Sequence, residues 1–202
     1  AEKLTGKTFK KEFLSEAEFW EAHEYIAKNF FWVNLDNDFT LENILDKFKY
    51  LVKTKGVKIC VIDPFNKLEY RLGTGQTKLD YISQVLDKII WFAKVNDVLV
   101  HLVAHPRKLE KDKEGKFPMP TMYDIAGSAD FWNKTDYGIA MSRKQDTNRV
   151  FINKGAISIQ KVKFKNLGEQ GLVDHCYNFR NGRFEEDFQP NDPIVNESSI
   201  WD

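Results

Sequence analysis

The chain has 202 residues, of which 42% are apolar, enough for one globular domain with a sizeable core. Thirty basic residues balance thirty acidic ones, so net charge gives no sign of a nucleic-acid partner and any basic surface has to be local. The two isolated cysteines, Cys60 and Cys176, exclude a disulfide framework and a cysteine metal site, and they predict a reducing, cytoplasmic setting. No apolar run reaches transmembrane length and no signal-peptide core is present, so we expect no membrane partner. The chain begins without methionine, which predicts a piece of a longer protein.

The first part of the chain predicts two helices with a strand between them. A capping box begins at Ser15, and the apolar spacing after it predicts a helix over 16–28. The apolar run 30–33 predicts a short strand. Thr40 is a second N-cap, and helical spacing continues from there to Gly56, a typical C-terminal stop.

The stretch VKICVIDPFNKL, residues 57–68, contains the strand around which we expect the fold to be organised. Its apolar run does not alternate, which is typical of a central parallel strand covered on both faces. The strand ends in Asp63 and Pro64, so a carboxylate lies at the carboxyl end of a parallel strand, where α/β sheets bind ligands. Asp63 is either a residue that caps a turn or a Walker B aspartate, which positions Mg²⁺ on nucleotide phosphates.

A second strand with a polar tip follows in the sequence. The loop 71–76 contains two glycines, but no Gly-Lys-Ser/Thr follows, so it does not indicate a phosphate cradle. Apolar spacing from 79 to 93 predicts a long helix, and the run 98–104 predicts a buried strand that ends at His105. This βαβ arrangement is right-handed, and it directs Asp63 and His105 into one crevice.

The second half of the chain begins with a polar segment and ends in short strands. The segment 106–121 is either a solvated loop or a loop that contacts phosphates. A short helix is predicted over 125–132 and a strand over 137–141. Later strands are predicted, with an Asn181-Gly182 hairpin turn, at 150–153, 157–164, 172–179 and 183–185. The sheet is therefore expected to begin parallel and to gain antiparallel strands.

Four stretches of the chain resemble, in order and spacing, the RecA-like core of hexameric replicative DNA helicases, the group of DnaB, phage primase-helicases and Twinkle. VKICVIDPFNKL is similar to the Walker B segment, and LVHLVAHPRKL to the next strand and its polar tip. DIAGSADFWNKTDYGIAMSRK resembles the following small-residue segment and strand. IQKVKFKNLGEQG resembles the strand that carries the arginine finger. The resemblance implies an α/β fold of the RecA-like P-loop NTPase class, with a partial motor domain at 1–188. The prolines and the Ser, Asn and Asp residues from Gln189 onward predict a flexible tail at 189–202.

The resemblance also implies roles for individual residues in nucleotide binding and hydrolysis. Asp63 would hold the water shell of Mg²⁺, and His105 would sense the γ-phosphate of ATP. Arg143 would lie near the nucleotide base. Lys161 and Lys163 match the positions that reach into the ATP site of a neighbouring subunit and neutralise charge on the γ-phosphoryl group; from spacing alone, a solvent-facing stripe explains them equally well.

The expected DNA contacts lie in the polar segment and the glycine that follows it. Backbone N–H groups and cations would grip the phosphates of single-stranded DNA without reading bases. The residues expected to do so are Arg107, Lys108, Lys111, Lys113, Gly127 and Ser128. Gly127 and Ser128 also fit a simple tight turn. Tyr177 is a candidate to stack on adenine, although a strand aromatic also suits a core position.

The chain departs from the helicase pattern at two points. Lys163 stands where the family has arginine, so this branch uses lysine, or Arg180 or Arg183 substitutes, or the site is weak. No GxxxxGK[ST] occurs in the 202 residues, which predicts the C-terminal part of a motor domain cut after the phosphate-binding loop and inactive by itself.

The expected function is that of an ATP- and Mg²⁺-dependent replicative helicase that translocates on single-stranded DNA as a homo-hexamer. One alternative is a RecA-like ATPase that does not unwind DNA, such as a recombinase or a clock-type module. Another is a binding module without a motor, which holds DNA or a protein partner. A metal nuclease built on Asp63 needs a second carboxylate on a neighbouring strand tip, and His105 stands there instead.

Overall fold

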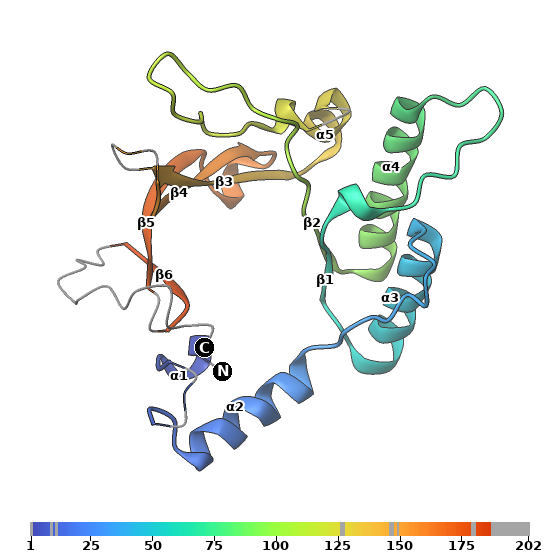
Figure 1. Cartoon of the computed structure of the whole chain (residues 1–202). Coiled ribbons are helices and arrows are strands. Elements are labelled where there is room, and N and C mark those ends of the chain that lie inside the picture. Colours follow the sequence, from blue (N-terminus) through green and yellow to red (C-terminus); the bar gives the residue numbers. More distant parts are fainter. Residues whose placement is uncertain are drawn as a thin grey trace. The chain divides into compact units, whose positions relative to one another are not determined.

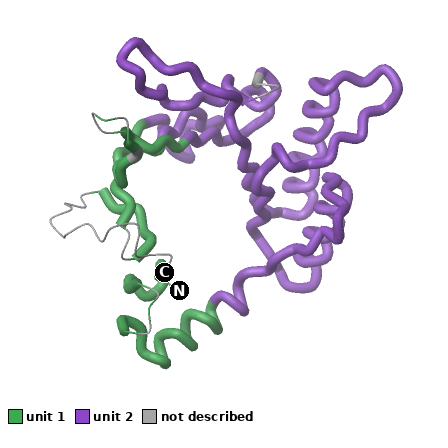
Figure 2. The backbone as a smooth tube through the Cα atoms, in the orientation of Figure 1, with its two compact units in different colours: residues 1–25, 141–157, 172–202 green, residues 26–140, 158–171 purple. Residues whose placement is uncertain are grey.

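The computed structural model of the chain describes residues 2–8, 10, 12–125, 128–145, 148, 150–178 and 181–186, apart from the side chains of 128 and 151. It divides into two compact units (Figure 2): unit 1 comprises 1–25, 141–157 and 172–202, and unit 2 comprises 26–140 and 158–171. The elements are labelled in Figure 1 and follow one another as α1 Glu2–Thr5, α2 Glu16–Asn29, α3 Leu41–Lys55, β1 Ile59–Ile62, η1 Phe65–Lys67, α4 Lys78–Asn96, β2 Leu99–Leu102, η2 Met122–Asp124, α5 Ser128–Lys134, β3 Tyr137–Gln145, β4 Phe151–Val162, η3 Lys165–Leu167, β5 Gly171–Asn178 and β6 Arg183–Glu185. Among these helices, none is both long and apolar enough to cross a membrane.

The two long helices of unit 2 begin and end at local sequence signals. The side chain of Thr40 accepts a hydrogen bond from the Asn43 N–H at the start of α3, and Gly56 ends that helix with φ 69°. Thr77 and Asp80 form a capping box at the start of α4. The predicted helices are therefore confirmed, with boundaries close to those expected.

Strands β1 and β2 form a parallel pair in which Ile59 lies opposite Leu99 and Ile62 lies opposite Leu102. Helices α3 and α4 lie on one side of this pair (Figure 1), and Cys60 and Ile62 of β1 are buried in the core that they form. The other face is open, because Ile59 is 57% exposed and Val61 is 53% exposed. The expectation of a strand covered on both faces is thus wrong within unit 2, since no described element of that unit covers Ile59 and Val61.

The strand predicted over 30–33 is also wrong. The structure has no strand there, although the N–H of Phe30 continues the α2 pattern by donating to the Ile26 carbonyl at 2.9 Å. Trp32 is 89% exposed. A strand needs a neighbour that pairs with its backbone groups, and residues 31–33 have no such neighbour in the ranges that the structure describes.

The C-terminal strands form a four-stranded sheet with the order β3-β4-β5-β6, and β5 and β6 are antiparallel. A single strand, β4, replaces the two strands predicted over 150–153 and 157–164. Gly155 allows β4 to pack closely against its neighbours at this point. A Cβ there would lie only 2.7 Å from His175 Nε2 and from the Ser142 carbonyl oxygen. The predicted hairpin turn is confirmed, with Gly182 at φ 65°. The α/β class, a parallel part followed by an antiparallel sheet, is confirmed.

Candidate functional site

The ends of β1 and β2 lie side by side in unit 2. Beyond the last residues of the two strands, the Val103 N–H donates to the Ile62 carbonyl at 2.9 Å, and the Phe65 N–H donates to the Val103 carbonyl at 2.7 Å. These bonds bring the two polar tips, Asp63 and His105, to the same edge of the parallel pair. Both residues are exposed. The arrangement fits a ligand bound outside the carboxyl ends of parallel strands.

Asn66 ties the two strand tips together and is a residue that sequence reasoning missed. It lies in η1, directly after the Asp63-Pro64 turn, and its side-chain Oδ1 accepts a hydrogen bond from the His105 N–H at 2.8 Å. The next residue toward the strand, Phe65, is buried and packs edge-on against the Phe131 ring with centroids 5.2 Å apart. A buried aromatic residue therefore anchors the turn that holds Asn66. A polar amide after Asp-Pro was the one available sequence signal.

The residues between β2 and η2 form a loop fastened at its base. Arg107 donates its N–H to the Asp124 carbonyl at 2.8 Å and Nη2 to the Tyr123 carbonyl at 3.2 Å. At the far end, Asp112 closes a tight turn, since its carboxylate accepts the N–H groups of Glu114 and Lys116 at 3.0 and 2.8 Å. The loop therefore has a defined shape without a helix.

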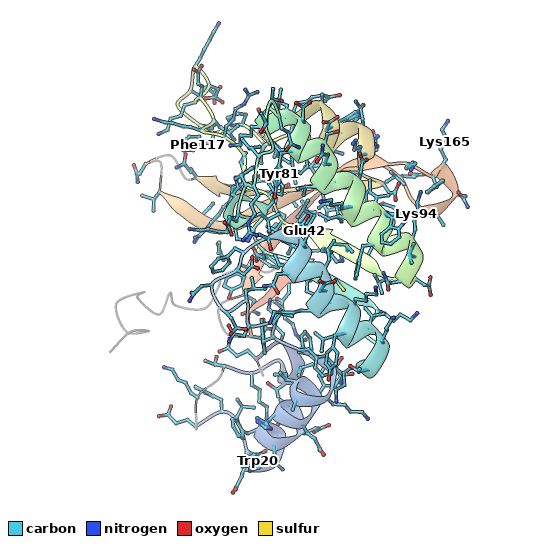
Figure 3. The ribbon with its side chains drawn as sticks, turned by 90° about the vertical axis from the view of Figure 1, so that its right-hand side faces the viewer. Trp20, Glu42, Tyr81, Lys94, Phe117 and Lys165 are labelled. Carbon is cyan, nitrogen blue, oxygen red and sulfur yellow. The ribbon has the colours of Figure 1, made fainter. Side chains whose placement is uncertain are left out.

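The loop presents several of the predicted DNA contacts to solvent. Lys108, Lys111 and Lys113 are exposed, and Lys111 Nζ lies 4.9 Å from the centre of the Phe117 ring, which is labelled in Figure 3. Exposed ammonium groups on long side chains can reach phosphate oxygens. Gly127 lies outside the described residues. Ser128 begins α5, and its side chain is not described.

The two candidate finger lysines contact the last turn of α5 and the residues that connect α5 to β3. Lys161 Nζ lies against the Trp132 carbonyl oxygen and 5.6 Å from the centre of the Trp132 ring. Lys163 Nζ forms an ion pair with Asp136 Oδ1 at 2.6 Å. Neither lysine is simply a member of a solvent-facing stripe. In this chain both ammonium groups are held by residues near the end of α5.

The residues predicted to lie near the nucleotide base, Arg143 and Tyr177, belong to unit 1. Arg143 Nε donates to the Ile152 carbonyl at 2.8 Å, across from β3 to β4. Tyr177 is half-buried, and its ring centroid lies 5.3 Å from that of Phe184. Arg143 and Tyr177 thus belong to a different unit from Asp63 and His105, which are part of unit 2.

Two arginines were alternatives to Lys163. The guanidinium of Arg183 donates to the Lys3 carbonyl through Nε at 3.0 Å and Nη2 at 2.8 Å, so it fastens α1 to the β5-β6 hairpin within unit 1. Arg180 lies outside the described residues.

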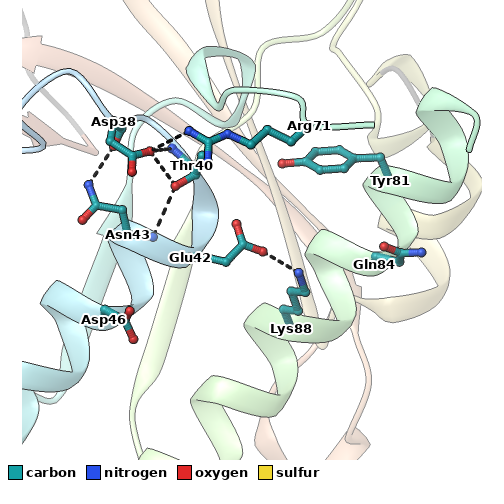
Figure 4. Close-up of a pocket in the computed structure, with 9 residues that line it drawn as sticks. All are labelled: Asp38, Thr40, Glu42, Asn43, Asp46, Arg71, Tyr81, Gln84 and Lys88. Atoms are coloured by element: carbon teal, nitrogen blue, oxygen red, sulfur yellow. Dashed lines mark hydrogen bonds and ion pairs between the residues drawn. The ribbon is translucent and has the colours of Figure 1, made fainter. Parts of the chain in front are cut away.

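A cavity of about 510 Å³ opens between α3 and α4 (Figure 4). Neither Asp63 nor His105 is among the residues that line it. Its cations are already paired: Lys88 with Glu42 at 2.5 Å, and Arg71 with Asp38 and Glu69. The Lys88 hydrogen bond lowers the pKa of the Glu42 carboxyl, so this pair stays ionised. A pocket with neutralised cations does not suit a phosphate group. It is lined by Asp38, Thr40, Glu42, Asn43, Asp46, Arg71, Tyr81, Gln84 and Lys88.

The chemistry of the strand tips fits magnesium held through water. Mg²⁺ keeps several waters and is commonly bound by one or two carboxylates together with substrate phosphates. Asp63 supplies one exposed carboxylate at the strand end. Across the described ranges there is no group of three or more His, Cys, Asp or Glu side chains that could hold a metal ion by themselves.

Comparisons with known proteins bear on the family and the fold of the chain. No protein-family model matches the chain. The chain is 32% identical over 199 residues to the chloroplastic/mitochondrial Twinkle homolog protein of Arabidopsis thaliana, a match that covers 92% of this chain and 28% of the relative. The chain thus spans less than a third of that relative's length.

Two solved structures share the fold. One is a DnaB-like replicative helicase solved in a study of its interactions with primase, with TM-score 0.63 and 20% identity over 87% of this chain and 43% of that one. The other is the ATPase domain of a second protein, with TM-score 0.58 and 20% identity over 74% of this chain and 52% of that one.

Proposed function

Because this chain belongs to the RecA-like replicative helicases, the family of Twinkle and DnaB, we propose that it is the C-terminal part of a motor domain that couples ATP hydrolysis to movement along single-stranded DNA. The observation that carries this proposal is the pair of strand tips, Asp63 and His105, linked through Asn66. Two polar groups on adjacent parallel strands form a site where a nucleotide phosphate and its metal can be bound together.

At these strand tips each side chain has a separate task. Asp63 would hold the water shell of Mg²⁺, which would neutralise part of the negative charge of the ATP phosphates. His105 contacts the γ-phosphate. Because the Asn66 amide fixes the main chain of His105, a displacement of His105 reaches Arg107 two residues later, and Arg107 holds the base of the loop through Tyr123. The loop can thus respond to the presence of the γ-phosphate.

The loop supplies the grip on DNA. Lys108, Lys111 and Lys113 contact phosphates, while Arg107 positions the loop base. The backbone N–H groups of Gly127 and Ser128 are proposed to add contacts to DNA phosphates, and Gly127 lies outside the described residues. Such contacts neutralise phosphate charge without reading sequence, as a motor that moves over any sequence requires.

The remaining predicted residues act in a homo-hexamer. Lys161 and Lys163 extend toward the ATP site of the neighbouring subunit and neutralise charge that builds on the γ-phosphoryl group. Arg143 and Tyr177 lie near the nucleotide base. On this proposal the 202-residue chain alone has no ATPase activity, because it contains no GxxxxGK[ST] loop. The cytoplasmic location stays a prediction, and the Arabidopsis relative is named as chloroplastic/mitochondrial.

The experiment that tests the proposal is ATP hydrolysis by the intact protein that contains this chain, with and without single-stranded DNA. Asp63→Asn should lower Mg²⁺-dependent turnover by at least about a hundredfold, since an amide holds the metal's water shell poorly. Asp97→Asn is the matched control. It removes an exposed carboxylate in the αL position after α4, a conformation that asparagine also adopts.

The outcomes separate the candidate functions. DNA-stimulated hydrolysis that is lost in Asp63→Asn and kept in Asp97→Asn supports the motor. Hydrolysis with no strand displacement on a forked DNA supports a RecA-like ATPase that does not unwind. A folded intact protein that binds single-stranded DNA and hydrolyses no ATP would be a DNA- or partner-binding module.

A further inference from the structure

The two lysines near the end of β4 contact one short segment, residues 132–136, which comprises the last turn of α5 and the residues that connect it to β3. Lys161 lies against the carbonyl oxygen of Trp132 in the last turn of α5. Lys163 forms its ion pair with Asp136, one residue before β3 begins. Side chains two residues apart on an extended chain point to the same side, so one connection can hold both ammonium groups.

Asp136 fixes the main chain of Lys163 as well as its side chain. The Lys163 N–H donates to the Asp136 carbonyl at 3.0 Å, while Lys163 Nζ meets Asp136 Oδ1 at 2.6 Å. The Phe164 ring, 5.4 Å from the same Nζ, limits the space on another side. One residue therefore determines both where the lysine side chain starts and where its charge lies.

The ion pair is short but remains open to solvent. The Lys163 and Asp136 side chains are 48% and 43% exposed. Water and salt screen such a pair, which contributes no more than about fivefold to an equilibrium. A nucleotide phosphate with several negative charges can therefore replace the single carboxylate as the partner of Lys163. These properties suit a carboxylate that orients the lysine and can be exchanged for a phosphate. They do not suit an ion pair whose role is to stabilise the fold permanently.

We propose that Asp136 is a positioning residue for Lys163, which it holds in place until the ammonium passes to a nucleotide phosphate of the neighbouring subunit. The inference rests on the proposed function, in which Lys163 acts in trans. Asp136 itself contacts no nucleotide. Its effect comes from the orientation that it gives to Lys163, since a charge already in place when the transition state forms needs little reorganisation.

The experiment is steady-state ATP hydrolysis by the intact protein with single-stranded DNA. Asp136→Asn should lower kcat by up to about fivefold while the KM for ATP changes less than about twofold, because a lysine that is no longer oriented is less often in place when the transition state forms. Asp136→Glu keeps the carboxylate and should restore part of the rate. Asp174→Asn is the matched control, since it removes another half-exposed ion pair, with Lys144 at 2.8 Å, and should leave kcat unchanged.

A double-mutant cycle tests whether Asp136 acts through Lys163. Lys163→Ala should lower kcat, and adding Asp136→Asn to it should lower kcat by less than a further twofold or so. An additional loss as large as the loss in Asp136→Asn alone would show that Asp136 acts by another route and would overturn the inference. The unfolding temperature of each variant, measured alongside, should stay close to that of the wild type.

The remaining outcomes distinguish this inference from the function on which it rests. If Lys163→Ala is impaired and Asp136→Asn is fully active, the positioning role is overturned and the motor function stands. If the wild-type intact protein shows no DNA-stimulated hydrolysis, or Lys163→Ala is fully active, the assignment of Lys163 fails and the positioning role fails with it.

Discussion

The two units of this chain are stabilised by different means. In unit 2, α3, α4 and β1 bury a continuous apolar core that includes Leu41, Ile44, Phe48, Ile62, Ile82, Val85, Leu86 and Phe92. In unit 1, the buried residues that the structure describes include the polar side chains of His175, Asn178 and Asn181. Apolar burial is non-directional, whereas a buried polar group has to meet a partner with the right geometry. The units should therefore respond differently to small changes.

Two of these buried side chains, Asn178 and Asn181, find their partner in Glu185. Asn178 Nδ2 donates to both carboxylate oxygens of Glu185 at 3.2 Å, and Asn181 Nδ2 donates to Oε1 at 2.9 Å. These hydrogen bonds lower the pKa of the Glu185 carboxyl. Asn181 Oδ1 in turn accepts the Arg183 N–H at 2.9 Å. The hairpin between β5 and β6 thus depends on a small network in which each amide has a defined role.

The largest effect on stability is expected in the apolar core of unit 2. Leu86→Ala should lower the free energy of unfolding by about 2–5 kcal/mol, since it removes buried methyl groups and leaves a cavity. Leu79→Ala on the same helix is the control, because Leu79 is 60% exposed and Leu86 only 4%. Urea denaturation measures both variants. Equal losses for the two would contradict the core as described.

A smaller loss is expected in the polar network of unit 1. Asn181→Ala should cost about 1–3 kcal/mol, because the Glu185 carboxylate and the Arg183 N–H each lose a partner. Hydrogen exchange of the β5 and β6 amides should accelerate in this variant, while the amides of α4 should keep their protection. Faster exchange in α4 to the same degree would show that the two units unfold as one.

The smallest effect concerns the start of α2, where Glu18 accepts hydrogen bonds from Lys7 Nζ at 2.5 Å and from Ser15. These bonds lower the Glu18 pKa to about 2. A lowered folded-state pKa stabilises the protein above the unfolded value near 4.5 and stops doing so as pH falls toward 2. The difference in Tm between wild type and Glu18→Gln should therefore shrink over that range. A Tm difference that stays constant down to pH 2 would argue against the ion pair. At neutral pH, added salt should reduce the Tm difference, because it screens the two charges.

Local signals were enough to predict much of the fold. Thr40 and Gly56 delimit α3 through groups within a few residues, so the helix could be predicted without knowledge of its neighbours. The Asn181-Gly182 turn and the Asp-Pro and His-Pro strand ends are likewise short-range features. The strand order along the parallel pair followed from the βαβ rule and is confirmed by the register of β1 and β2.

The sequence by itself therefore determined the helices, their caps and the polar residues at the strand ends, because each depends on neighbours along the chain. The parallel pairing of β1 and β2 could be predicted because a single helix connects the two strands. Only the tertiary structure decided that one face of β1 stays open, that residues 30–33 form no strand, and that Lys163 meets Asp136. These features depend on groups distant in sequence. Burial, strand pairing and ion pairs are fixed by what lies opposite in space, and hydrophobic periodicity carries no information about that.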